Sequence, residues 1–448
     1  MQGKQKTMEL MKDILRRSRA EQTEVIVMGT DEQLTRFANN EIHQNVAETN
    51  VTVTVRVAKD KRVGMATAND LSQDGLDRVL QMAQDVVAVQ PENPDFPGFP
   101  DVPAAEEVSA FDDATASYSP EARAQAVGMI CQSAQQNGLN AAGAFSTAVN
   151  ELGVANSHGV LAYHAGTVAD VVTVVMSDDS SGYASERAWQ VGRMDVAAMG
   201  DEAISKALKS RNPRDLEPGT YAVVLEPYAA QDLLQMLGFT GMGALAFQEG
   251  RSWMNDRIDQ QVMAPSISIW DDGLDTNGIP MPFDFEGTPK QRVDIIRRGI
   301  AVGPVYDTAT ARQEEDRTST GHALPPAMAA TYGPMALNLF MARGEATLED
   351  MVASTERGIL ITRFHYTRPV HPRDAVITGL TRDGTFLILD GEIAYPIKNL
   401  RYTQSYLSAL AGTEMVGNTL KTLGSYVGAE RVPALKMGEF RFTGATQF

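Results

Sequence analysis

The sequence predicts an α+β protein in which an N-terminal α/β region, residues 1–215, precedes a β-rich C-terminal domain, residues 216–448. Two observations predict this division. The order helix, sheet, helix occurs twice before residue 215, which suggests a structural duplication. Beyond residue 260, short apolar runs alternate with turn residues, as in a barrel or a sandwich.

The first unit is predicted from local patterns. A helix opens the chain, and a short strand is expected over 24–28. Valines alternate with polar residues over 51–57, which predicts a half-buried strand. The charged stretch 59–62 predicts a hairpin turn, and a second helix is expected to begin near Asp70.

A proline-rich segment, residues 90–105, follows the first unit. Prolines stand at every third position from Pro91 to Pro103. Such a run cannot lie inside a helix and is typical of an extended, polyproline-like connector. A ligand for SH3 domains has the same composition, but a connector is the simpler interpretation.

The second unit repeats the plan of the first. Ser119-Pro120 predicts a helix start, because serine is a good cap and proline suits the first helical position. Strands are expected over 141–149, 152–156 and 168–175, and a helix over 195–209.

The C-terminal domain begins after Pro218-Gly219. A buried strand is predicted over 221–225, and a helix from about Ala229. Further strands are expected at 358–362, 385–389 and 394–397, with Asp390-Gly391 as a hairpin turn.

Composition excludes several classes of protein. The net charge is -18 and no dense block of Lys and Arg occurs, so nucleic acid is not expected as a partner. Cys131 is the only cysteine, which excludes an internal disulfide and a cysteine-rich zinc site. No signal-peptide pattern and no apolar run of about 18 residues is present. We therefore expect a cytoplasmic protein without a membrane partner.

Familiar catalytic motifs are missing. The sequence contains no G-x-S-x-G, no Walker loop and no H-E-x-x-H. His365 and His371 are six residues apart, so a strand could present both on one side, but Pro369 interrupts that strand and two unrelated structural histidines are the simpler interpretation. The other four, His322 among them, are expected at turns or on the surface. On the residues alone, the catalytic residues are unknown.

Several stretches, in order, resemble one family. They are Asn39-Asn-Glu-Ile42, 49–57, Val63-Gly-Met-Ala-Thr67, Leu225-Glu-Pro227, Phe283-Asp-Phe-Glu-Gly287, Thr308-Ala-Thr-Ala-Arg312, Ser319-Thr-Gly-His322, Glu356-Arg-Gly-Ile-Leu360, Gly391-Glu-Ile393 and Pro396-Ile-Lys-Asn399. Together they resemble the TldD/PmbA family, also called modulators of DNA gyrase. The resemblance implies a dimer that encloses a cavity and cleaves unfolded or extended peptides, held by strand addition.

In the TldD branch of that family, a helix carries H-E-x-x-x-H, whose histidines bind zinc and whose glutamate acts as general base. Here Gln235 and Thr240 stand at the histidine positions and Met236 at the glutamate. The family's C-terminal cysteine ligand is also missing near Gly424-Ser425. The chain therefore resembles the PmbA (TldE) branch, which lacks the motif. Gln235, Met236 and Thr240 are expected to contact substrate, and no metal or other cofactor is expected in this chain.

The resemblance implies the metal-free subunit of a peptidase. Its expected partners are a peptide substrate and either a second copy or a TldD-type subunit that supplies zinc. Two alternatives stay open: a non-enzymatic regulator that binds peptides or proteins, and a peptidase with an unrecognised site. The sequence does not decide whether this chain is itself an enzyme, because the family is hydrolytic but the zinc ligands are missing.

Overall fold

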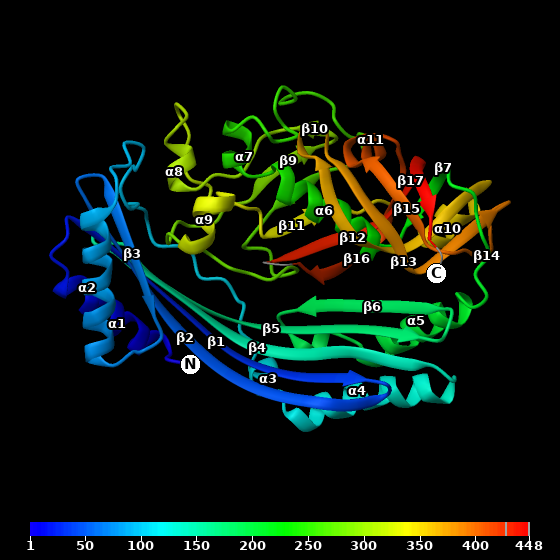
Figure 1. Cartoon of the computed structure of the whole chain (residues 1–448), viewed down its shortest axis with the longest axis horizontal. Helices are drawn as coiled ribbons and strands as arrows, with labels where there is room; N and C mark the ends of the chain where they lie inside the picture. Colours follow the sequence, from blue (N-terminus) through cyan, green and yellow to red (C-terminus); the bar gives the residue numbers. More distant parts are fainter. Residues whose placement is uncertain (426–427, 447–448) are drawn as a thin grey trace.

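The computed structural model describes residues 1–425 and 428–446. It has two parts, an N-terminal sheet with its helices and a mixed C-terminal domain that lies above it in Figure 1. The predicted fold class is confirmed. Among the described residues, no helix has both the length and the apolar character needed to cross a membrane.

The N-terminal part contains six strands. Its elements are α1 (Lys4–Arg17), β1 (Gln22–Ala38), β2 (Glu41–Lys59), β3 (Arg62–Ala68), α2 (Gln73–Val89), α3 (Asp113–Ala116), α4 (Pro120–Gln136), β4 (Asn140–Asn156), β5 (Leu161–Met176), β6 (Ser181–Ala188), a 3-10 turn (Val191–Arg193) and α5 (Val196–Lys209).

All six strands form one antiparallel sheet in the order β3-β2-β1-β4-β5-β6. Each half of this sheet is a three-strand meander with a helix before it and a helix after it. The duplicated order predicted from the sequence is therefore present, and the two copies meet where β1 pairs with β4. Separate apolar clusters lie under the two halves.

Most of the strand predictions were too short, and two examples show the reason. The strand expected over 24–28 extends to Ala38, where Asn39 and Asn40 turn the chain with φ of 53° and 63°. Asparagine tolerates this left-handed conformation, so the pair makes a two-residue hairpin turn. The strands expected over 141–149 and 152–156 are one strand, β4, because it pairs with β1 and β5 without interruption.

The proline-rich segment is fixed to the sheet. The Phe99 N–H donates to Gln22 Oε1 at 2.8 Å, and Asn156 Nδ2 donates to the Pro100 carbonyl at 2.7 Å. Phe99 is buried and lies under the guanidinium of Arg56. The segment therefore connects the two units as a packed strap.

The C-terminal part is richer in strands. Its elements are β7 (Thr220–Leu225), α6 (Pro227–Gly241), α7 (Ala244–Gln248), β8 (Ile269–Asp271), β9 (Val293–Arg297), β10 (Ile300–Ala301), α8 (Thr308–Ala311), α9 (Pro326–Tyr332), β11 (Asn338–Met341), α10 (Leu348–Ala353), β12 (Arg357–His371), a 3-10 turn (Pro372–Asp374), β13 (Val376–Leu389), β14 (Glu392–Pro396), β15 (Leu400–Ser405), α11 (Tyr406–Ala411), β16 (Thr413–Gly424) and β17 (Ala429–Ala445).

Five of these strands close on themselves. The pairings run β17-β15-β13-β12-β7, and β7 pairs again with β17. Of the two arrangements expected, a barrel or a sandwich, this ring corresponds to the barrel. Helix α6 packs against β12 and β17, and its apolar side chains belong to the largest core cluster.

The two parts meet at the loop that follows β8. Phe283 of this loop packs with Ile26, Val154 and Val160 of the N-terminal part. At the tip, Gly287 has φ of +78°, and an added Cβ would lie 2.5 Å from Val160 Cγ1. Glycine is therefore required here both by the backbone conformation and by the close approach of the two parts.

Candidate functional site

Helix α6 carries the residues that the sequence placed at the site. Pro227 occupies its first turn directly after β7, where the missing N–H has no intrahelical acceptor to lose. Leu233, Leu234 and Leu237 are buried on one face. The opposite face presents polar and half-buried side chains, so this face is the one that can meet a ligand.

Gln235 and Met236 lie on that face and line a cavity of about 410 Å³. The remaining walls are mostly apolar and come from distant parts of the chain: Phe239, Met328, Tyr332, Met335, Ala336, Leu339, Thr367, Pro369, Ser425 and Glu430. Phe239 is 48% exposed at the mouth, with its ring 6.0 Å from that of Tyr332. Flexible methionine walls can adapt to apolar groups of different shape.

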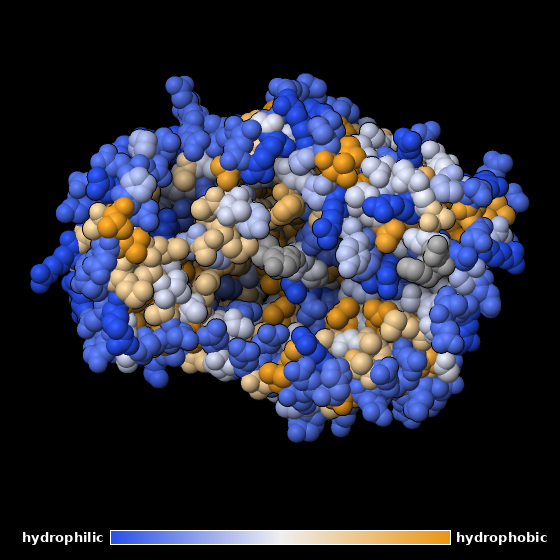
Figure 2. Space-filling view, in the orientation of Figure 1, coloured by the Kyte–Doolittle hydropathy of each residue, from blue (hydrophilic) through white to orange (hydrophobic). Residues whose placement is uncertain are grey.

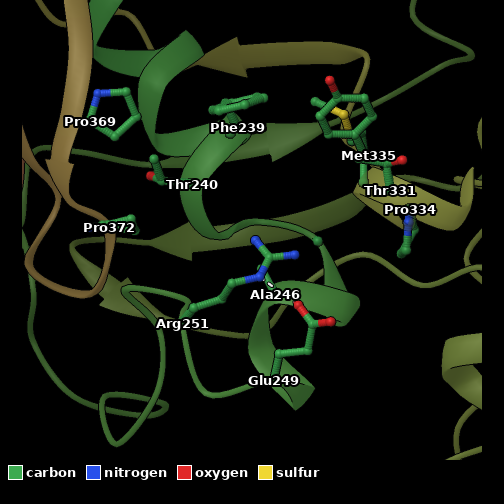
Figure 3. Close-up of a pocket in the computed structure, with 13 residues that line it drawn as sticks. Phe239, Thr240, Ala246, Glu249, Arg251, Thr331, Pro334, Met335, Pro369 and Pro372 are labelled. Carbon is green, nitrogen blue, oxygen red and sulfur yellow. Dashed lines mark hydrogen bonds and ion pairs between the residues drawn. The ribbon is translucent and has the colours of Figure 1, made fainter. Parts of the chain in front are cut away.

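Thr240 is placed differently. It is only 3% exposed, and its hydroxyl donates to the Met236 carbonyl at 2.7 Å. It lines a second hollow of about 360 Å³ that shares Phe239 and Tyr332 with the first. Figure 3 shows Phe239 and Thr240 on one side of this hollow and the ion pair of Arg251 with Glu249 on another. The structure thus brings Gln235 and Met236 together in one cavity and leaves Thr240 beside it.

A buried carboxylate lies in the wall of the first cavity. Glu430 is 4% exposed, and its Oε2 accepts from Gln231 Nε2 at 2.9 Å. The same amide nitrogen donates to the Gly424 carbonyl, also at 2.9 Å. Burial raises the pKa of Glu430 to about 7. This group can therefore gain or lose a proton near neutral pH.

A second carboxylate, Asp232, directly follows Gln231 on α6. Asp232 accepts from the Tyr406 hydroxyl at 2.7 Å and from the Thr367 hydroxyl at 2.8 Å. Tyr406 is in turn 2.6 Å from the Tyr402 hydroxyl. Burial raises the pKa of Asp232 to about 6, and the two hydroxyl donors oppose that rise. The chain of donors holds the aspartate in one orientation.

A third hollow, of about 420 Å³, joins the site to the N-terminal sheet. It shares Ser425 with the first cavity and reaches Gly29, Glu151, His164 and Arg187. Figure 2 shows apolar side chains gathered around a hollow between the two parts of the molecule. The first hollow shares several lining residues with the second and Ser425 with the third, so the second and the third each adjoin the first.

The side chains at the motif positions do not fit zinc. Gln235 offers a neutral amide, Met236 a thioether, and the Thr240 hydroxyl is already bonded to the helix. Neutral amide and hydroxyl groups are poor substitutes for imidazole and thiolate on this metal. Within residues 1–425 and 428–446, no group of three or more His, Cys, Asp or Glu side chains is arranged to hold a metal ion.

Two histidines lie elsewhere than sequence reasoning expected, and the first, His164, is half-buried within strand β5. His322 is fully buried, where it was expected at a turn or on the surface. Its Nε2 lies 2.8 Å from Asp271 Oδ1, and its Nδ1 lies 2.9 Å from the Thr320 hydroxyl. Burial lowers its pKa, so the ring is held as a neutral bridge within the core. Sequence spacing gave no signal for the contact with Asp271, 51 residues away.

Sequence reasoning also missed Gln231, Asp232 and Glu430. The first two precede Gln235 on the exposed face of α6, so the helical period contained a signal for them. Glu430 is one of 57 acidic residues and lies 199 residues from its partner Gln231. No local pattern marks it.

Three family profiles match the chain. They are the PmbA/TldA metallopeptidase C-terminal domain at residues 218–444, domain 1 at 23–87 and the central domain at 97–211. The first alone covers half of the chain.

Individual relatives agree with these profiles. The chain is 28% identical over 221 residues to the Metalloprotease TldD homolog of Buchnera aphidicola, a match that spans 49% of this chain and 45% of that protein. It is 23% identical over 402 residues to Metalloprotease PmbA of Escherichia coli O157:H7, which spans 86% of this chain and 84% of that protein. The chain thus matches less than half the length of the TldD homolog.

Solved structures share the fold. TldE from Thermococcus kodakarensis superposes with a TM-score of 0.88 at 17% identity and covers 97% of this chain and 100% of its own. A candidate modulator of a DNA gyrase from Thermotoga maritima superposes with a TM-score of 0.85 at 18% identity and covers 97% of this chain and 99% of its own. At these identities the likeness concerns the fold alone.

Proposed function

The chain belongs to the PmbA/TldA metallopeptidase family, and from this premise we propose that it is a metal-free member that binds extended peptides. In this proposal a TldD-type relative supplies zinc and cleaves the peptide. The observation that carries it is the cavity beside α6, where the positions of the family's zinc motif are filled by Gln235, Met236 and Thr240. A cytoplasmic location is part of the same proposal.

The shape and chemistry of the cavity support a peptide ligand. Its walls are dominated by methionine, aromatic and aliphatic side chains, and a few polar groups lie at fixed places among them. Small binding sites commonly combine apolar walls with a few oriented polar groups in this way. The two adjoining hollows offer further space for the flanking residues of an extended chain.

Strand β12 gives further support. It pairs with β7 only from Gly358 to Ile361, whereas it pairs with β13 as far as His371. Its stretch past Ile361, which includes Thr367 and Pro369 at the cavity, therefore has no paired strand on its second side within the described residues. An extended peptide adds to a sheet along such an edge, although Pro369 offers no N–H there.

A binding experiment tests the proposal. The probe is a fluorescent, unstructured peptide of about ten residues with aromatic and aliphatic side chains, titrated with the pure chain and followed by anisotropy. Phe239→Ala should weaken binding about tenfold, because an exposed aromatic anchor is lost. Met82→Ala is the matched control, since Met82 is 56% exposed on α2 and lines none of the three hollows.

A chelator distinguishes metal-free peptide binding from binding that depends on zinc. Binding should be unchanged by EDTA, and a TldD-type relative should cleave the probe faster when this chain is added. Equal binding by the Phe239→Ala and wild-type chains would refute the assignment of the cavity. About one tightly held zinc per chain in elemental analysis would refute the metal-free assignment.

A second candidate function rests on Asp232 and Glu430. Asp232, which is half-buried and bonded to Thr367 of the cavity wall, and Glu430, which is buried in that wall, have pKa values raised to about 6 and about 7 and could exchange protons with a bound peptide near neutral pH. The chain would then hydrolyse peptides alone and without metal. Chelator-resistant cleavage by the pure chain, abolished by Asp232→Asn, would favour this candidate over the first.

A further inference from the structure

The first cavity has a carboxylate in its wall and no basic side chain to balance it. Among the described residues that line the cavity, Glu430 is the only acid, and none is a lysine, an arginine or a histidine. Glu430 enters the wall from β17, and Gln231 Nε2 of α6 donates to its Oε2 at 2.9 Å. The Ser425 side chain also bonds with it. Both partners are neutral, so the charge of an ionised Glu430 has no counter-ion beside it.

Every other buried carboxylate in the described part of the chain has a basic partner or a backbone donor. Four of them lie 2.5–2.8 Å from a basic nitrogen, namely Glu24, Glu226, Asp271 and Asp383. The other three accept bonds from backbone N–H groups, namely Glu151, Asp284 and Asp307. Glu430 has neither kind of partner among the described residues. A buried charge without such a partner is costly, so this carboxylate is short of a stabilising group.

The charges around Glu430 do not fill that place. Arg187 acts on it from a distance, but the Arg187 Nε donates to Asp170 at 2.5 Å and its Nη1 to the Gly428 carbonyl at 2.7 Å. Asp232, half-buried on α6, adds a second negative charge nearby. The cavity is therefore complementary to a cation that a ligand brings with it.

The other walls fit the apolar stem of such a cation. They include three methionines and Leu339, and the rings of Phe239 and Tyr332 lie 6.0 Å apart. Lysine carries a compact ammonium group on a flexible four-carbon stem, and aromatic faces attract cations. The N-terminal ammonium group of a peptide has no such stem. Arginine binds carboxylates best through both oxygens, and Gln231 already donates to one oxygen of Glu430.

We propose that the first cavity binds a lysine side chain of the peptide, with its ammonium group against Glu430 and its stem between Phe239 and Tyr332. The inference rests on the proposed function and specifies the class of peptide that the site takes. The net charge of -18 is consistent with it, because an acidic protein attracts cationic ligands from solution.

Peptides that differ at one position test the inference. Three fluorescent, unstructured peptides of about ten residues are acetylated at the N-terminus and carry lysine, norleucine or arginine at one central position, with no other basic residue. Norleucine keeps the stem of lysine and lacks the ammonium group. In anisotropy titrations at pH 8, the wild-type chain should bind the lysine peptide about tenfold or more tightly than the norleucine peptide. A fourth peptide, with norleucine and a free N-terminus, should bind no better than the acetylated one.

The preference for lysine should depend on pH. Burial raises the pKa of Glu430 to about 7, whereas lysine stays charged up to about pH 10. The lysine preference should therefore fall about tenfold between pH 8 and pH 6, as Glu430 takes up a proton. Arg187 keeps its charge over this range, and Asp232, with a pKa raised to about 6, titrates at its lower end.

A substitution at Glu430 separates its effect from that of Asp232. Glu430→Gln should bind the lysine and norleucine peptides alike at both pH values. Glu439→Gln is the matched control, since Glu439 is exposed on the same strand and lines none of the three hollows. This control should keep the preference and its pH dependence. Circular dichroism checks that both variants fold, and the pH dependence of the wild-type preference decides the matter if Glu430→Gln does not.

The outcomes distinguish this inference from the proposed function. Equal binding of the lysine and norleucine peptides by the wild-type chain, or a lysine preference that survives Glu430→Gln, would overturn the inference and leave peptide binding in place. Binding of the arginine peptide or of the free N-terminus as tight as that of lysine would also overturn the assignment to lysine. If none of the four peptides binds, the proposed function and the inference are both wrong.

Discussion

Replacing Glu286 by glutamine should make the protein more resistant to alkaline pH. Glu286 lies where the two parts meet, near Asp284, Asp307 and Glu24. Two cations lie near this group of acids: Arg56, whose guanidinium donates to Glu24 at 2.7 Å, and Lys290, whose charge opposes the rise in the pKa of Asp284. Burial, together with the three neighbouring carboxylates, raises the pKa of Glu286 to about 8. The junction therefore holds a proton that the unfolded chain would release.

Proton linkage determines whether ionisation of Glu286 raises or lowers the stability of the folded state. A carboxyl group with a raised pKa binds more protons in the folded state, so its contribution is complete below about pH 4.5 and is lost as the pH rises to 8. A tenfold change in acid dissociation corresponds to about 1.4 kcal/mol, so the whole rise amounts to roughly 5 kcal/mol at most. Because Glu286 is partly exposed and titrates together with Asp284, we expect it to contribute about 2 kcal/mol to the free energy of unfolding.

Glutamine cannot ionise, and its amide oxygen can still accept the bond that the Thr308 N–H donates to Glu286 at 3.1 Å. Urea unfolding should therefore show similar stability of both proteins at pH 5, and at pH 9 an advantage of about 2 kcal/mol for Glu286→Gln. Glu345→Gln, at an exposed carboxylate, is the control and should follow the wild type. A difference between wild type and Glu286→Gln that stays constant from pH 5 to pH 9 would refute the reasoning.

Two further predictions concern the metal and the junction. The triple variant Gln235→His, Met236→Glu, Thr240→His should bind zinc weakly, lose it on dialysis and cleave no peptide, because no thiolate or orienting groups accompany the new ligands. Elemental analysis measures the zinc, and chromatography of a peptide substrate measures cleavage. Stoichiometric zinc together with peptide cleavage would contradict this prediction. Gly287→Ala should lower the free energy of unfolding by about 1–3 kcal/mol, since it combines a positive φ with a close contact. Gly159 also has a positive φ, but nothing lies within 4 Å of an added Cβ. Gly159→Ala should therefore lower the free energy of unfolding by less in the same urea experiment, and the difference between the two variants measures the effect of the close contact.

Local signals in the sequence were sufficient for several elements. Ser119 caps α4 with its side chain on the Ala122 N–H, as the Ser119-Pro120 pair predicts. Asp390-Gly391 joins β13 to β14 as a tight turn. These features depend on bonds within a few residues, so their patterns can be read along the chain. The family resemblance likewise located Gln235 and Met236, because the motif lies within one helix.

The lengths of β1 and β4 were not predictable in the same way. Residues 30–33 of β1, Thr-Asp-Glu-Gln, are all polar, and a stretch of this composition has little local preference for the extended form. Pairing with β2 on one side and β4 on the other extends it to Ala38. The length of β1 is therefore decided by pairing on both sides, and one partner, β4, is distant in the sequence.

The sequence by itself determined the fold class and the repeated helix–sheet–helix order, and it indicated the helix on which we propose the site. Only the tertiary structure decided which groups meet there. Glu430 reaches Gln231 because β17 pairs with β7, and α6 follows directly after β7. Glu286 meets Glu24 because the C-terminal loop packs on the N-terminal sheet. Such contacts depend on the closure of sheets between residues some 200 or more positions apart, and hydrophobic periodicity and turn chemistry carry no information over that distance.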